Sequence, residues 1–272
     1  MRRLTAAVAT IVTALAVGAA GLTPAHAEPP RNYTWRNDPI SKTLAGKPFA
    51  NQVLHRVPGS LHDAPRVPAE ADQAAARGNA LFGPGTPLYI GNDALCTTAV
   101  AGYNNRGEKV AITAGHCGKV GDPVSSADAP QVGRVGTVTQ VNRELDYAVI
   151  TLARNTEVSR SYNGVTVNHL GGAPVQAGAR VCKQGVASGM TCGPTFSDWQ
   201  TMNINQVCAM QGDSGAPLLI GDRAIGMVNG GVFRPPFDLA CHTPLQGVVH
   251  APTGAVRMDT VLAAVDGGFR LP

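Results

Sequence analysis

Three short segments of the sequence carry residue types that together can perform nucleophilic catalysis. His116 lies in Thr-Ala-Gly-His-Cys, Asp146 opens Asp-Tyr-Ala-Val-Ile, and Ser214 lies in Gly-Asp-Ser-Gly. A serine hydroxyl is a weak nucleophile until a base within hydrogen-bond reach removes its proton. Imidazole suits that task near neutral pH, and a buried carboxylate fixes its tautomer and stabilises the imidazolium. The pattern predicts a catalytic triad of His116, Asp146 and Ser214.

Each of these residues also has a simpler interpretation. His116 beside a cysteine suits a packed histidine, Asp146 a strand cap, and Ser214 a turn residue. Their joint occurrence in this chain order, each at the edge of an apolar segment, favours catalysis. The order differs from that of subtilisins and α/β-hydrolases. Glycines around the serine would also let backbone N–H groups converge on a developing oxyanion.

The segments that must position these residues are predicted to be short strands. Each candidate is rich in Val, Ile, Leu or Thr and is bounded by Gly, Asn, Asp or Pro. The candidates are Cys96–Tyr103, Lys109–Ala114, Gln131–Val141, Tyr147–Leu152, Arg180–Lys183, Ala216–Ile220 and Ala224–Val228. Asp259–Val265 predicts a C-terminal helix that Asp259 caps. Many short strands separated by turns imply an all-β barrel or sandwich.

Two zones precede this region. Residues 1–27 combine Arg2 and Arg3, an uncharged apolar run and a small-x-small ending, which predicts a signal peptide rather than a membrane anchor. Residues 28–83 lack cysteine and are predicted to be a propeptide, which would make the precursor a zymogen, or else a flexible extension. If they are a propeptide, the mature chain is expected to start within a few residues of Leu81 to Gly85. One short helix is expected there, between Pro68 and Gly78.

Composition excludes several functional classes. Residues 84–272 carry thirteen basic and thirteen acidic residues, so no basic stripe suggests nucleic-acid binding. The six cysteines of an exported chain favour disulfides, with 15 possible pairings. A zinc site at His116 and Cys117 lacks any C-x-x-C partner. We therefore expect no metal and no cofactor.

The three motifs, TAGHC, LDYAVI and CAMQGDSGAP, resemble the signature segments of chymotrypsin-like serine proteases. The branch that they resemble most is that of the small secreted bacterial enzymes, the streptogrisins and α-lytic protease. The resemblance covers about residues 85–272. It implies two perpendicular six-stranded antiparallel β-barrels, at about 84–170 and 175–272, with the active site between them and a short C-terminal helix.

The resemblance also implies roles for individual residues. His116 would be the general base, Asp146 its orienting partner and Ser214 the nucleophile, with the N–H groups of Gly212 and Ser214 as the oxyanion hole. The implied disulfides are Cys96–Cys117, Cys182–Cys192 and Cys208–Cys241. Lys183 stands where the family places a cation for the aspartate before the nucleophile. We therefore expect a buried Lys183–Asp213 ion pair, the alternative being a solvated lysine.

The resemblance further implies a substrate pocket. Its residues would be Cys208, Ala209, Gln211, Val228, Asn229, Gly230 and Gly231. None of them is acidic, which predicts cleavage after Phe, Tyr, Leu or Met rather than after Arg or Lys. Small Ala or Val would be preferred instead if the long loop before Cys241 folds Phe233 or Phe237 into the slot.

The predicted protein is a secreted, monomeric serine endopeptidase that acts on peptides or proteins and binds neither nucleic acid nor, after signal cleavage, a membrane. A catalytically silent homologue that serves as an extracellular binding module is one alternative, although the intact triad argues against it. A serine esterase is the other. Gly230 and Gly231, which would pair with an extended peptide as an added strand, favour peptide substrates.

Overall fold

The computed structural model describes residues 33–91 and 94–272, and the predicted signal peptide lies outside them. β-strands dominate this part of the chain, and its only α-helices are α1 (Pro39–Leu44), α2 (Ala69–Ala76) and α3 (Met258–Ala264). None of these helices is long and apolar enough to cross a bilayer. The predicted all-β fold class is confirmed.

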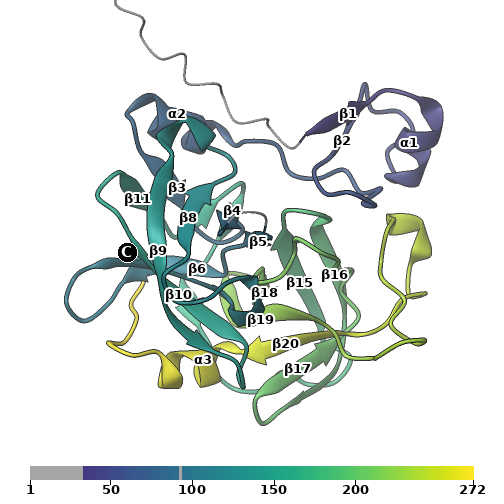
Figure 1. Ribbon diagram of the computed structural model, residues 1–272. Coiled ribbons are helices and arrows are strands. Elements are labelled where there is room, and N and C mark those ends of the chain that lie inside the picture. The colour runs from purple at the N-terminus through teal and green to yellow at the C-terminus, as the bar shows by residue number, and fades with distance from the viewer. Residues whose placement is uncertain (1–32, 92–93) are drawn as a thin grey trace, which may run out of the picture.

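The C-terminal half forms a closed barrel (Figure 1). Six strands follow one another around it, and β19 pairs with β20 to close the ring. They are β15 (Arg180–Gly185), β16 (Gly189–Trp199), β17 (Met202–Asn205), β18 (Pro217–Ile220), β19 (Arg223–Gly231) and β20 (Thr253–Arg257). The short β14 (His169–Leu170) adds a parallel pairing to β19. Closure leaves the barrel without a free edge along most of its length.

The N-terminal half forms a strongly wrapped seven-stranded sheet in the order β5-β4-β8-β9-β10-β7-β6. Its strands are β4 (Pro87–Ile90), β5 (Ala94–Thr97), β6 (Val100–Tyr103), β7 (Lys109–Ala114), β8 (Pro123–Ser126), β9 (Arg134–Asn142) and β10 (Tyr147–Leu152). The edge strands β5 and β6 are consecutive in the chain, so the sheet curls back on itself. Apolar side chains that include Leu88, Val135 and Ile150 fill its interior.

Residues 33–83 form ordered elements that pack on both halves. The antiparallel hairpin of β1 (Thr34–Arg36) and β2 (Val53–His55), with α1, lies beside β15 and β16 (Figure 1). Farther along, β3 (Ala80–Phe82) pairs in parallel with β11 (Thr156–Val158). The small hairpin of β12 (Ser161–Tyr162) and β13 (Val165–Thr166) follows β11.

Some local expectations need correction. The structure splits the expected strand Cys96–Tyr103 into β5 and β6, because the chain turns at Thr98 and Ala99 to change neighbours. Helix α3 begins at Met258 with Arg257 as its N-cap. Asp259 therefore does not cap this helix. Its carboxylate accepts instead from the N–H of Gly172 and pairs with Arg257.

The expected helix between Pro68 and Gly78 is present as α2, with Pro68 as its N-cap. Gly78 has a φ of +79°, the left-handed conformation that commonly follows the end of a helix.

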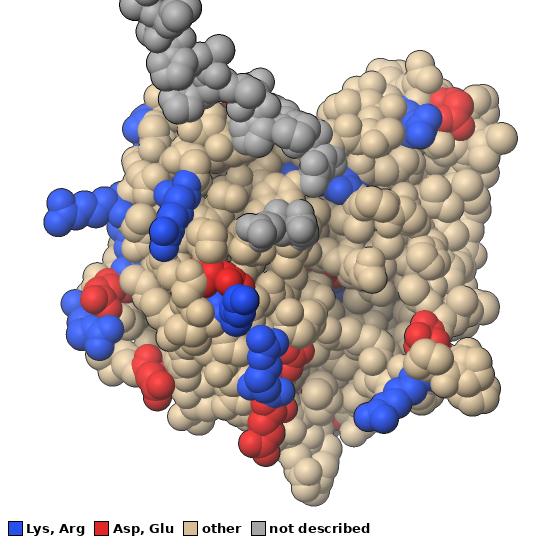
Figure 2. Space-filling model, viewed as in Figure 1, with Lys and Arg blue, Asp and Glu red and all other residues tan. Residues whose placement is uncertain are grey.

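Charged residues are unevenly spread over the face shown in Figure 2. Lys, Arg, Asp and Glu side chains lie side by side over the N-terminal sheet, whereas the surface over β15 and β16 is mostly uncharged. Because positive and negative side chains alternate there at close spacing, and salt screens exposed charges beyond the Debye length, this surface exerts little net electrostatic force on distant charges.

Candidate active site

The structure brings His116, Asp146 and Ser214 together between the two halves. His116 lies on a 3₁₀ turn, Gly115–Cys117, that directly follows β7, and Asp146 immediately precedes β10. Ala114 at the end of β7 lies opposite Tyr147 at the start of β10. The side chains of His116 and Asp146 therefore lie close together. Nδ1 of His116 lies 2.8 Å from Oδ2 of Asp146, and its Nε2 lies 2.8 Å from Oγ of Ser214. This geometry lets the imidazole accept the serine proton while the carboxylate holds its other nitrogen.

Asp146 is held in place from two sides. Its Oδ1 accepts the backbone N–H of His116 at 2.7 Å, and its Oδ2 accepts the side-chain amide of Asn229 at 2.8 Å. Burial alone would raise the pKa of the Asp146 carboxyl, but the hydrogen bonds from His116 and Asn229 outweigh it and lower this pKa below its ordinary value. The Asp146 carboxyl is therefore ionised near neutral pH.

The turn that carries Ser214 is held by Asp213, whose side chain is fully buried. One oxygen of Asp213 accepts the N–H groups of Ala187 and Ser188, at 2.9 and 3.2 Å. The other accepts the N–H of Met210 at 3.2 Å and the hydroxyl of Ser188. Lys183, also fully buried, places Nζ 3.3 Å from Oδ2 of Asp213. The ion pair that the sequence predicts is thus present. Burial lowers the pKa of Lys183, and the charge of Asp213 opposes that shift.

Two glycines allow this turn to approach the N-terminal half. Gly212 has a φ of +97°, and a methyl group on Gly215 would lie only 2.2 Å from the carbonyl oxygen of Thr97. Thr97 donates its N–H to the carbonyl of Ser214 at 2.9 Å and its hydroxyl to that of Gly212 at 2.8 Å. No hydrogen bond within residues 33–91 and 94–272 uses the N–H of Gly212 or Ser214, the expected oxyanion donors.

Three disulfides are present in the pairings that the resemblance implies: Cys96–Cys117, Cys182–Cys192 and Cys208–Cys241. The first ties the turn of His116 to β5. The second spans the β15–β16 hairpin beside Lys183. The third joins the segment before the nucleophile to the end of the long loop.

A cavity of about 330 Å³ opens next to Ser214. Its lining includes most of the expected pocket residues: Ala209, Gln211, Val228, Asn229, Gly230 and Gly231. Cys208 does not line it, because its sulfur is buried in a disulfide and faces His62, with Nε2 at 3.1 Å. The expected role of Cys208 in contacting substrate is therefore not supported by its position.

The sequence left open whether the long loop before Cys241 enters this site, and it missed Asp238. The loop supplies Phe233 and Asp238 to the cavity wall, whereas Phe237 is 74% exposed and does not line it. Asn229, interpreted from the sequence only as a pocket residue, also bonds to Asp146. Its amide oxygen accepts the N–H of Val256 at 2.7 Å, which fixes its orientation. The bond from Asn229 to Asp146 joins the two halves of the structure, so no local sequence pattern could have revealed it.

Comparisons with known proteins agree with this geometry, although no protein-family model matches the chain. Streptogrisin-C of Streptomyces griseus is 27% identical over 199 residues, covering 69% of this chain and 43% of that protein. Serine protease 2 of Streptomyces fradiae is 27% identical over 167 residues, covering 54% of this chain and 92% of that one. The chain thus matches less than half the length of streptogrisin-C.

The crystal structure of Thermobifida fusca protease A aligns with 71% of this chain and 100% of its own, at 26% identity and a TM-score of 0.56. Together with the fold and the arrangement around Ser214, these similarities support the assignment of the chain to the chymotrypsin-like serine proteases. Within that class they support the bacterial branch.

The buried ion pair yields a prediction about stability. Lys183→Met should lower the free energy of unfolding by about 3–5 kcal/mol, because it strands the Asp213 carboxylate in the interior. The double variant Lys183→Met/Asp213→Asn should regain part of that loss. Urea unfolding measures both, with the exposed Lys119→Met as a matched control expected to change by about 0.5 kcal/mol or less. A loss below about 1 kcal/mol in Lys183→Met would contradict the assignment.

The bonds to Asp146 predict a pH dependence. Asn229→Ala should cost about 1.5–3 kcal/mol near pH 7, where Asp146 is ionised. A carboxyl with a lowered folded pKa contributes stability above its unfolded pKa of about 3.9 and loses it as pH falls through the folded value. The difference between wild type and variant should therefore shrink as the pH falls below about 3.9. The bonds of Asn229 to the Val256 N–H and to the backbone carbonyl of Asp146 do not depend on this ionisation and should remain. The exposed Asn51→Ala is the control, and a difference independent of pH would refute the link.

Proposed function

We propose that this chain is a secreted serine endopeptidase that hydrolyses peptide bonds through an acyl-enzyme. The observation that carries the proposal is the contact of Ser214 Oγ with His116 Nε2 at 2.8 Å, at the mouth of the 330 Å³ cavity. The signal peptide expected at residues 1–27 and the three disulfides support secretion.

In the proposed mechanism, Ser214 Oγ attacks the substrate carbonyl carbon as His116 Nε2 removes its proton. The carbonyl oxygen becomes an oxyanion and is bound by the N–H groups of Gly212 and Ser214. His116 then gives the proton to the leaving amine as the C–N bond breaks. Water, deprotonated by the same imidazole, attacks the ester and releases the acid and the free serine. Asp146 stays ionised throughout and stabilises the imidazolium.

An extended peptide fits this site better than a small ester. The end of β19, from Asn229 to Gly231, pairs with β20 along one edge. Along its other edge, the pairing with β18 stops at Met227, so within the described chain this edge has no strand beside it. The free edge borders the cavity, so substrate backbone can add to it as a strand. Neither Gly230 nor Gly231 places a side chain in the way.

We further propose a preference for large apolar residues before the cleaved bond. Ala209, Val228 and Ala251 give the cavity apolar walls, and burying an apolar side chain there contributes about 1.5–3 kcal/mol. Phe233 lines the cavity but is 52% exposed, so it narrows the slot without filling it. Asp238 is exposed to solvent, where a carboxylate contributes little binding to a cation.

Peptide substrates that differ only in the residue before the cleaved bond test both proposals. We expect kcat/KM for Phe to exceed that for Ala by about tenfold or more, with Arg slower still. Ser214→Ala should lower activity by roughly 10⁴-fold or more. Fastest cleavage after Ala would indicate that Phe233 blocks the slot. Fastest cleavage after Arg, abolished by Asp238→Asn, would overturn the pocket assignment.

A further inference from the structure

The loop of residues 56–63, here called the clamp loop, contacts the region of the expected oxyanion hole. We propose that the clamp loop is a positioning element of the catalytic site, and that residues 33–83 therefore belong to the working enzyme rather than being discarded. The inference rests on the proposed function. It differs from the sequence-based prediction of a removable propeptide.

The first contact is apolar. Val57 is 8% exposed and packs with Val186 and Ala187 in one small cluster. A methyl group on Gly212 would lie 3.0 Å from Cγ2 of Val57 and 3.1 Å from Cγ1 of Val186. Val57 thus packs against Gly212, whose N–H is an expected oxyanion donor. A shift of this peptide would move that donor.

The second set of contacts is polar. The hydroxyl of Ser60, itself buried, donates to the carbonyl of Ala187 at 2.7 Å. Ala187 in turn donates its N–H to Asp213 at 2.9 Å, so a single residue separates the clamp loop from the carboxylate that shapes the turn of Ser214. Leu61 donates its N–H to the carbonyl of His242, next to the Cys208–Cys241 disulfide. The clamp loop therefore touches both the segment that binds Asp213 and the end of the long loop that lines the cavity.

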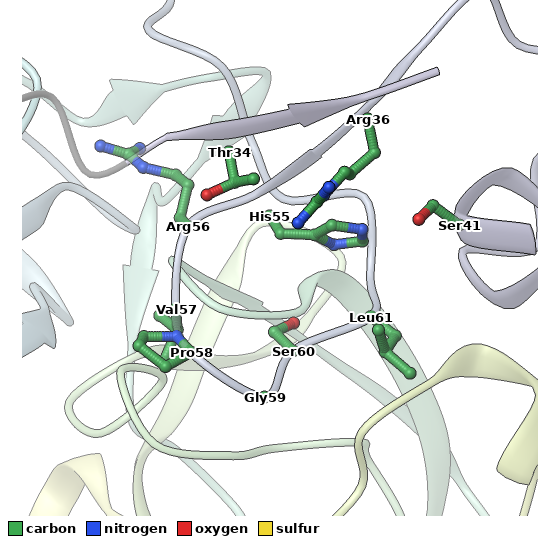
Figure 3. Close-up of a pocket in the computed structure, with 10 residues that line it drawn as sticks. All are labelled: Thr34, Arg36, Ser41, His55, Arg56, Val57, Pro58, Gly59, Ser60 and Leu61. Atoms are coloured by element: carbon green, nitrogen blue, oxygen red, sulfur yellow. The ribbon is translucent and has the colours of Figure 1, made fainter. Parts of the chain in front are cut away.

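On its other side, part of the clamp loop borders a cavity. Figure 3 shows residues Val57–Leu61 beside this cavity of about 620 Å³, with Thr34 and Arg36 of β1 and Ser41 of α1 across it. This part of the loop therefore lies between the protease on one side and the cavity on the other.

The segment is also anchored to the N-terminal half. Arg56 forms an ion pair with Asp128 at 2.7 Å, and both side chains are 2% exposed. Tyr162 donates to the other oxygen of Asp128. Removing one partner of such a buried pair strands the other charge, which opposes release of the segment.

The stretch from Ala80 to Leu88, which leads into the first barrel, is not accessible to cleavage in this structure. Every residue from Ala80 to Leu88 is buried, and β3 is paired with β11 throughout. The window of Leu81 to Gly85, in which the sequence predicts maturation, lies wholly inside this stretch. A protease needs an exposed, extensible segment, so cutting here requires local unfolding.

Kinetics of Val57→Ala and Ser60→Ala in the full chain test the positioning role. We expect kcat to fall about tenfold or more with little change in KM, since loss of a whole oxyanion donor costs about 100–1000-fold. Affinity for a peptide boronate, whose tetrahedral adduct needs the oxyanion hole, should fall by a similar factor. Affinity for the product peptide, which needs only the substrate cavity, should stay the same. Phe49→Ala, 98% exposed in the same segment, is the matched control.

Intact mass of the purified, active wild-type enzyme completes the test. We expect the active species to retain residues 33–83. Unchanged boronate affinity in both variants, or a fully active species that begins after Asp63 and so lacks the clamp loop, would overturn the inference. An inactive wild type would instead refute the proposed function, so the two failures are distinguishable.

Discussion

The buried carboxylate of Asp213 is the constraint on which the rest of the site depends. An ionised group without solvent must be neutralised and hydrogen-bonded from all sides, and Asp213 meets this need through Lys183, Ser188 and three backbone N–H groups. Those partners come from the β15–β16 hairpin and from the turn itself. Satisfying one charge therefore fixes the turn before the nucleophile against the hairpin beside it, and with it the direction of the Gly212 and Ser214 N–H groups.

The triad inherits its geometry from this turn and from two paired strands. β7 and β10 deliver His116 and Asp146 from the N-terminal half, while Thr97 bonds to the carbonyls of Gly212 and Ser214 across the interface. Asn229 ties Asp146 back to β19 of the closed barrel. The two halves are thus locked together at the atoms where chemistry would occur. Such preorganisation is what electrostatic stabilisation of an oxyanion requires.

Strand positions could be predicted from the sequence where the local pattern of apolar residues matches the packing in the folded protein. β7 and β10 have the expected bounds because both are apolar runs ended by turn residues. β16, from Gly189 to Trp199, was missed, since Gly, Pro, Ser and Asp within it hide any alternation. The pairing of Lys183 with Asp213 followed from a motif resemblance, but Asn229 and Val57 act through contacts between distant segments. Their roles depend on register and packing, which no local pattern encodes.

The central claim is that the described chain holds a preformed, reactive serine. Reaction of the purified full chain with diisopropyl fluorophosphate, followed by intact and peptide mass spectrometry, tests it most directly. We expect one adduct per chain, located on Ser214, and almost none in His116→Ala, because the serine needs its base. A folded wild-type protein that gains no adduct would contradict the account and favour a catalytically silent binding module.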